Sequence, residues 1–219
     1  MVTASQSTET VIYQGQFGEF TITDRDRQGV IIYRSGLAVA ALSFLLGTSL
    51  LLWQGATPFV LNILTVLFAF FALGLGTSLL TIHIYLVPLH RLLQMFWLVG
   101  TVFSTAIAFS SPEPLALFIY KHPLTLLGTG FIFAALTGIY FKEAFCFNRL
   151  ETKLLTPLVP ILLLGFMAGI FPSEIQQLFL ASWSILFAVF ALRKVFQAIP
   201  PDIGDKSVFS YLENQKQQS

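Results

Sequence analysis

Charged residues are scarce in this sequence. Only 11% of its 219 residues are Asp, Glu, Lys or Arg, against roughly 25% in a typical soluble domain. A soluble protein covers its surface with polar groups, whereas 55% of this chain is hydrophobic. The composition therefore excludes an ordinary soluble domain, and the net charge of +1 gives no basis for binding nucleic acid.

Cysteine, histidine and the usual catalytic motifs are also sparse or missing. The single cysteine, Cys146, excludes an intrachain disulfide, and only three histidines are present. The sequence contains no HExxH, GxSxG, glycine-rich phosphate loop or CxxC. These absences favour a non-enzymatic protein, and the sequence identifies no cofactor.

Apolar residues instead come in six blocks, each comparable to the ~20 residues that a helix needs to cross a bilayer. The blocks cover residues 35–53, 58–85, 89–109, 123–141, 155–171 and 174–196. We therefore predict an all-α fold, a polytopic transmembrane bundle of about six helices in contact with the lipid bilayer. Residues 1–34 then form a polar N-terminal segment, residues 35–198 the membrane domain, and residues 199–219 a polar C-terminal tail.

The basic residues predict how the bundle is oriented. Of the twelve Lys and Arg residues, all but Lys121 lie before the first block, after an even-numbered block or in the tail. Cytoplasmic loops of membrane proteins carry an excess of Lys and Arg. We therefore expect both termini of this multi-pass protein to be cytoplasmic.

Two segments outside the blocks have local structure of their own. Residues 11–23 are rich in β-branched and aromatic residues, residues 24–29 are typical of a turn, and residues 30–33 of another short strand. We expect a small hairpin or three-stranded flap there. The apolar run within residues 112–123 is too short to span a membrane, which favours an interfacial turn of helix.

Small residues recur at helical spacing in two of the blocks. Gly130, Ala134 and Gly138 share one face of the fourth predicted helix, and Gly165 and Gly169 form a GxxxG pair in the fifth. Small residues let helix backbones approach closely in lipid. We interpret both patterns as packing within the bundle, with a homodimer face as the alternative.

The middles of all six blocks contain no Asp, Glu, Lys, Arg or His, which argues against a proton-coupled transporter or a charged channel.

Polar residues gather instead at the cytoplasmic ends of the second, third and fourth predicted helices. Four of them are plausible ligands for zinc, iron or a tetrapyrrole metal: His83, His90, Glu143 and Cys146. Their spacing matches no metal signature. The alternative is interfacial anchoring, with Glu143 paired to Arg91 or Arg149 and Cys146 as a small buried hydrophobe.

Three strings give the chain a likeness to a known family: YQGQFGEF at residues 13–20, TDRDR at 23–27 and KEAFCF at 142–147. With the order of the apolar blocks, they resemble an uncharacterised family of integral membrane proteins from cyanobacteria and plastids, a domain of unknown function. The resemblance covers about residues 10–200. It implies a six-helix membrane protein of a photosynthetic lineage, in a plasma or thylakoid membrane, and carries no activity or ligand.

Three hypotheses about function follow. The preferred one is a non-enzymatic accessory or assembly factor that acts by binding within a larger membrane complex. The second is a metal- or tetrapyrrole-binding protein with its site at the cytoplasmic ends of the second to fourth helices. The third is a transporter of a small neutral solute, which would need a polar-lined cavity near the middle of the membrane.

Overall fold

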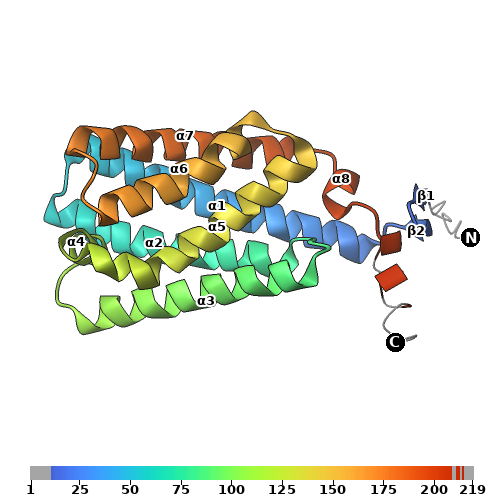
Figure 1. Cartoon of the computed structure of the whole chain (residues 1–219), viewed down its shortest axis with the longest axis horizontal. Coiled ribbons are helices and arrows are strands. Elements are labelled where there is room, and N and C mark those ends of the chain that lie inside the picture. The colour runs from blue at the N-terminus through green and yellow to red at the C-terminus, as the bar shows by residue number, and fades with distance from the viewer. Residues whose placement is uncertain (1–10, 209–210, 213, 215–219) are drawn as a thin grey trace, which may run out of the picture.

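The structure, a computed structural model, describes residues 11–208, 211, 212 and 214 and is a bundle of long helices (Figure 1). Six helices in the described part are long and apolar enough to cross a membrane. They are α1 Asp24–Gln54, α2 Pro58–Thr81, α3 Val87–Ser110, α5 Leu126–Phe147, α6 Leu150–Met167 and α7 Ser173–Phe196. The prediction of an all-α transmembrane bundle with six helices is therefore confirmed.

Helix α1 begins at Asp24, earlier than the first predicted span. Thr23 and Asp26 form a capping box: the Thr23 Oγ1 accepts from the Asp26 backbone N–H at 3.2 Å, and an Asp26 carboxylate oxygen accepts from the Thr23 N–H at 2.8 Å. The turn predicted at residues 24–29 and the strand predicted at 30–33 are therefore wrong. Val30, Tyr33 and Leu37 recur at helical spacing and are all buried in the bundle.

The predicted small hairpin is confirmed as two antiparallel strands, β1 Ile12–Gly15 and β2 Gly18–Thr21. The C-terminal segment, which contains the short helix α8 Pro200–Ile203, lies beside it. The backbone N–H of Gln16 donates to the Asp205 carboxylate at 2.6 Å, and that of Phe17 donates to the Ser207 hydroxyl at 3.0 Å. We call the end of the bundle that carries β1, β2 and α8 the proximal end (Figure 1).

The opposite, distal end carries the interfacial helix that the sequence predicts. This helix is α4 Leu115–Lys121, which a 3₁₀ turn, η1 Pro123–Thr125, joins to α5. The backbone N–H of Leu115 donates to the Thr65 hydroxyl of α2 at 3.3 Å, and the Leu115 side chain is buried. Helix α4 therefore covers part of the distal end of the bundle.

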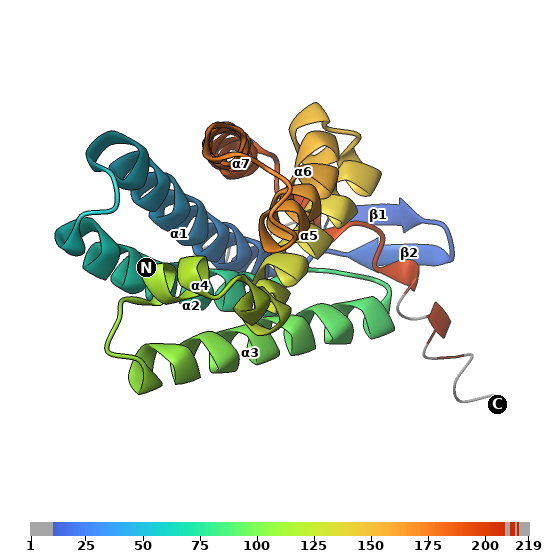
Figure 2. The ribbon, with the colours of Figure 1, turned by 60° about the vertical axis from the view of Figure 1, so that its left-hand side comes forward.

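Glycines set a close helix crossing between α1 and α2. A Cβ added to Gly36 would lie 2.6 Å from the Gly74 carbonyl oxygen, and a Cβ added to Gly74 would lie 2.6 Å from that of Gly36. No residue with a side chain fits at either position without moving a backbone. Helix α3 lies at the edge of the bundle beside α2 and α5 (Figure 2).

The two predicted small-residue patterns have different outcomes. Gly138 packs within the bundle, since a Cβ there would lie 2.2 Å from Leu93, but a Cβ on Gly130 would meet only Leu126 of its own helix, at 4.0 Å. Gly165 packs against Phe171, and Gly169 follows the end of α6 with φ +66°. The left-handed backbone conformation of Gly169 is one that favours glycine after a helix end. The GxxxG pair therefore shapes the end of α6 and does not pack two helices together.

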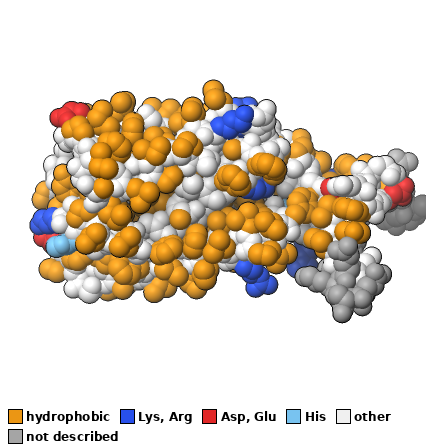
Figure 3. Space-filling view, viewed as in Figure 1, with side chains coloured by type: hydrophobic (Ala, Val, Ile, Leu, Met, Phe, Trp, Pro, Cys, Tyr) orange, Lys and Arg blue, Asp and Glu red, His pale blue; other side chains and the backbone are white. Residues whose placement is uncertain are grey.

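The outer surface of the bundle is apolar along its length. Figure 3 shows hydrophobic side chains over the middle of the molecule, with charged side chains toward the two ends. Large apolar residues such as Leu42, Leu73 and Phe109 are exposed on the spans. A surface of this kind is matched to the hydrocarbon of a bilayer and not to water.

Candidate functional site

The four metal ligands predicted from the sequence have separate surroundings. Cys146 is exposed, so its interpretation as a buried hydrophobe is wrong. Glu143 is fully buried and forms ion pairs with Lys142 and Lys194, so the expected pairing with Arg91 or Arg149 is also wrong. Among the described residues, no three or more His, Cys, Asp or Glu side chains gather as a metal site requires. Metal or tetrapyrrole binding by this set stays a prediction.

The two predicted histidine ligands are each held by the protein. The His90 Nε2 lies 2.6 Å from the carbonyl oxygen of Leu79 and 3.1 Å from the Gln94 amide nitrogen. His83, between α2 and α3, is half-buried beside Gly29. Burial lowers the pKa of His83, although the nearby Asp26 carboxylate opposes that shift. Burial at this position therefore favours the neutral imidazole.

A buried ion network lies at the proximal end, where α1, α5, α7 and α8 meet. Its members are Arg34, Lys142, Glu143, Lys194 and Asp202. The Lys194 Nζ lies 2.7 Å from one Glu143 oxygen, and the Lys142 Nζ lies 2.9 Å from the other. The Tyr33 hydroxyl also donates to Glu143, at 3.3 Å. The Glu143 carboxylate thus ties α5 to both α1 and α7.

Asp202 completes the network from α8. Its carboxylate pairs with Lys194 and accepts from the Arg34 Nε at 2.9 Å and Nη2 at 2.6 Å. Arg34 also donates to the carbonyl oxygens of Gln197 and Ala198 at 2.6 and 2.9 Å. The Phe147 ring centroid lies 4.2 Å from the Lys194 Nζ, a cation–π contact. The three cations of the network thus share two carboxylates, and the two carbonyl oxygens and the Phe147 ring are their further partners.

The chemistry of this network suits a structural role and not metal binding, because a carboxylate already bound by two ammonium groups is a poor metal ligand. The orientation prediction places Lys194 with the basic residues of the C-terminal tail, whereas its side chain is buried in the bundle. Trp183, Phe187 and Phe190 are buried at helical spacing on α7, and the same face continues to Lys194. That periodicity is the signal that places Lys194 inside the bundle.

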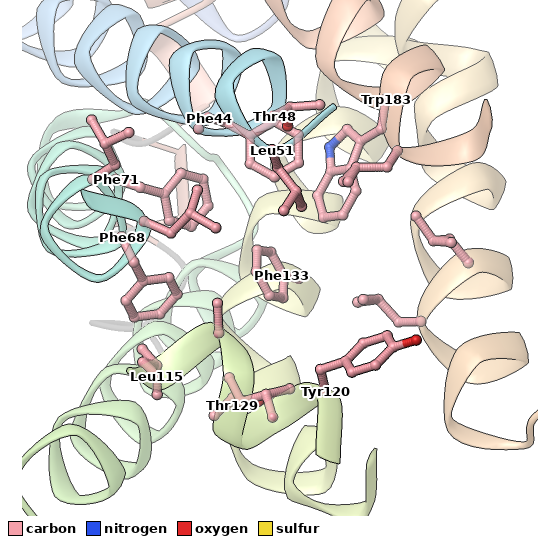
Figure 4. Close-up of a pocket in the computed structure, with 18 of the residues that line it drawn as sticks. Phe44, Thr48, Leu51, Phe68, Phe71, Leu115, Tyr120, Thr129, Phe133 and Trp183 are labelled. Atoms are coloured by element: carbon pink, nitrogen blue, oxygen red, sulfur yellow. The ribbon is translucent and has the colours of Figure 1, made fainter. Parts of the chain in front are cut away.

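A cavity of about 320 Å³ lies in the distal half of the bundle, between α1, α2, α4, α5, α6 and α7. Its walls are mainly aliphatic and aromatic, and Figure 4 shows several of the aromatic rings facing one another across it. The labelled aromatic residues are Phe44, Phe68, Phe71, Tyr120, Phe133 and Trp183. Among the described residues, no Asp, Glu, Lys, Arg, His or Cys lines the cavity.

Trp183 marks the inner wall of this cavity. Its ring lies 4.5 Å from that of Phe44 and 5.3 Å from that of Phe133, between ring centroids. Its indole N–H donates to the Tyr140 hydroxyl at 3.2 Å, so the polar edge of the ring has a partner outside the cavity lining. The few polar groups of the walls include Thr48 and Thr129, and the Thr129 hydroxyl donates to the carbonyl oxygen of Thr125. The cavity is thus suited to an apolar molecule.

A family of uncharacterised integral membrane proteins, DUF2301, has a family model that matches residues 77–211. The chain belongs to this family. No curated protein and no solved structure matches it. The match confirms the resemblance seen in the sequence, while the cyanobacterial or plastid origin stays a prediction.

The DUF2301 region includes much of the structure just described. It contains Glu143, Lys194 and Asp202 of the ion network and the parts of the cavity wall that come from α4 to α7. The hairpin and α1 lie before it. The family establishes a multi-pass membrane protein and assigns no activity, so the function rests on the geometry of the site.

Proposed function

We propose that this protein is a non-enzymatic binding protein of the membrane, and that its ligand is an acyl chain of a bilayer glycerolipid. The observation that carries the proposal is the apolar cavity of about 320 Å³ within the distal half of the spans. Ligand pockets in proteins typically measure about 300–1,000 Å³ and are lined mostly by apolar and aromatic side chains. The cavity meets both criteria at the lower limit of size.

The lining of the cavity supports an apolar occupant. Water is a poor occupant because few polar groups line the walls. An acyl chain from the surrounding bilayer would fill the space without any polar contact.

The lining also bears on the other hypotheses. A transporter of a small neutral solute needs polar groups that replace the water around its solute, and these walls are almost entirely apolar. General acid–base catalysis most often uses His, Glu, Asp, Lys, Tyr or Cys, and of these types only Tyr120 lines the cavity among the described residues. Both observations support a binding role.

The test is to fill the cavity and measure retained lipid. Thr48 lines the cavity from α1 and is buried, so Thr48→Phe places a ring in the space of the chain. Thr77→Phe is the matched control, because Thr77 is exposed on the lipid-facing side of α2. After purification and detergent exchange, mass spectrometry should find stoichiometric glycerolipid with the wild type and with Thr77→Phe. Thr48→Phe should lose it.

Three outcomes would overturn the proposal. One is a wild-type protein that retains no lipid under conditions that keep it folded. Another is equal retention by Thr48→Phe and Thr77→Phe, which would place the lipid elsewhere on the surface. The third is retention of an isoprenoid lipid alone, which would replace the acyl chain as the occupant.

An accessory or assembly role in a larger membrane complex is a second proposal, and the hairpin favours it. Val11 and Ile12 are exposed apolar residues outside the spans, at the start of β1, whose outer edge has no strand partner among the described residues and could accept one. If the hairpin binds a partner, Ile12→Asn should lower the apparent mass of the complex extracted in mild detergent. Lys153→Gln, at an exposed site on α6, should leave the mass unchanged. Equal masses for the two variants would remove this support.

A further inference from the structure

A second hollow, of about 350 Å³, lies between α5 and α6 and is separate from the ion network. Gly130 and Ala134 line it from α5, and Pro160 and Leu164 line it from α6. Leu164 is 58% exposed, so the hollow reaches the outer surface of the bundle. That surface faces lipid, and we call this hollow the α5–α6 groove.

The α5–α6 groove and the distal cavity share part of their walls. Three residues line both spaces: Leu126, Phe133 and Leu163. On the cavity side, the Phe133 ring lies 5.7 Å from that of Phe71 and 5.3 Å from that of Trp183, between centroids. The two hollows are therefore divided by a layer of side chains from α5 and α6, without a helix between them.

The groove leaves open space between α5 and α6 beside Gly130. A Cβ on Gly130 would meet no atom of α6 within 4 Å. Helix α6 contains Pro157 and Pro160, and each proline removes a backbone hydrogen bond and favours a kink. Rotation of the Phe133 and Leu163 side chains, with a small movement of α6, would join the groove to the cavity.

The extent of the groove indicates what occupies it. Its α5 wall runs from Leu126 to Thr137, which is only the distal half of that helix. A transmembrane helix of a partner would need contact along most of the span, whereas a lipid chain needs only a short apolar channel. The groove also lies within the apolar length of two candidate spans, where lipid is the solvent.

We propose that the α5–α6 groove is the lateral path by which a phospholipid acyl chain passes from the bilayer into the cavity, with Phe133 and Leu163 as its gate. The inference rests on the proposed function, because it concerns access to the same binding site. It adds the direction of access and the residues that control its rate.

The experiment uses Trp183 as a reporter of chain arrival. The chain has three tryptophans, so Trp53→Phe with Trp97→Phe leaves Trp183 alone. Trp183 is 2% exposed, and contact with it requires a chain inside the cavity. Delipidated protein in detergent is mixed with phosphatidylcholine brominated on one acyl chain, whose bromine atoms quench tryptophan on contact. The rate and the final extent of quenching are recorded.

Ala134→Phe obstructs the groove without touching the cavity, because Ala134 lines only the groove. Ala106→Phe on α3, at an exposed position, is the matched control. In the Trp183 reporter protein, Ala134→Phe should slow quenching about tenfold and leave its final extent unchanged, since an obstruction raises the barrier and not the affinity. Leu163→Ala should speed quenching by removing part of the gate.

The outcomes separate this inference from the function on which it rests. If the reporter protein shows no quenching, the cavity takes no acyl chain, and the proposed function fails together with the path. If quenching occurs but Ala134→Phe and Leu163→Ala match the rate of Ala106→Phe, the lateral path fails and the proposed function stands. Should Ala134→Phe not fold, Leu163→Ala alone decides, since an unchanged rate would overturn the path.

Discussion

The Lys194 ammonium lies 2.7 Å from a Glu143 carboxylate oxygen, and neither side chain is exposed. This ion pair joins α7 to α5 inside the proximal end of the bundle. Removing one partner of such a pair leaves the other charge buried without compensation, which costs far more than the pair contributes by forming. The pair therefore makes the packing of these helices sensitive to a single substitution.

Lys194→Met should lower the free energy of unfolding by about 3–5 kcal/mol, because Glu143 and Asp202 lose their shared ammonium. Thermal unfolding of the purified protein in detergent measures the loss. Lys153→Met is the matched control at an exposed site on α6, and its effect should stay within about 0.5 kcal/mol. Equal melting temperatures for the two variants would contradict a stabilising ion network.

The coupling between the two residues can be measured directly. Glu143→Gln removes the carboxylate charge and keeps the shape of the side chain. Because residues in direct contact do not contribute independently, the double variant of Lys194→Met and Glu143→Gln should be destabilised by less than the sum of the single variants, with a coupling of about 0.5–3 kcal/mol. Strict additivity would show that the pair seen here does not form in the membrane protein.

Asp205 holds the hairpin to the C-terminal segment. Its carboxylate accepts hydrogen bonds from the Ser207 hydroxyl and N–H and from the Gln16 N–H. These bonds favour the ionised form, so they lower the pKa of Asp205 below its ordinary value of 3.8. A carboxyl whose pKa is lower in the folded protein stabilises the fold above the ordinary pKa, and this contribution is lost as the pH falls through the folded value.

Acidification below pH 3.8 should therefore loosen the hairpin, and Asp205→Asn should loosen it at neutral pH as well. Amide hydrogen exchange of β1 and β2, followed by mass spectrometry, is the measurement. Protection should fall in the wild type as the pH drops and should already be low in Asp205→Asn. Asp24→Asn, at an exposed site in the first turn of α1, is the control. Unchanged protection in Asp205→Asn would show that Asp205 does not anchor the hairpin.

The six spans could be predicted because membrane crossing depends on the length of an apolar run, which is visible along the sequence alone. A run of about 20 apolar residues is enough to identify a spanning helix, and the prediction holds for each of the six.

The start of α1 was missed for a local reason. The charged residues 24–27 look like a turn, but Thr23 and Asp26 have the spacing of a capping box, which the sequence also shows.

Two features of the site differ in how far the sequence could reveal them. The inward position of Lys194 follows from the helical period of Trp183, Phe187 and Phe190. The cavity has no such signal, because its volume depends on how far the distal halves of the helices separate. Phe133 and Leu163 look like ordinary core residues until the helices are placed in space.

Close approach of α1 and α2 gives a prediction about packing. Gly36→Ala puts a Cβ 2.6 Å from the Gly74 carbonyl oxygen, which is too close for either backbone to stay in place. The variant should lose about 1–3 kcal/mol of stability, as is typical of overpacking. Gly130→Ala, where the Cβ would meet only Leu126 at 4.0 Å, should not destabilise the protein, since Ala favours a helix over Gly. Thermal unfolding in detergent compares the two, and equal stability would contradict the close crossing.

Cys146 offers a direct test of the predicted orientation, because it is the only cysteine and is exposed near the proximal end of α5. All but one of the twelve basic residues predict that this end is cytoplasmic. A membrane-impermeant maleimide should therefore label Cys146 in inverted vesicles and not in right-side-out ones. Moving the thiol to the distal end, with Cys146→Ser and Gln54→Cys, should reverse that pattern. Labelling of Cys146 from the outside would instead place the hairpin and the C-terminal segment on the exterior, and the ion network with them.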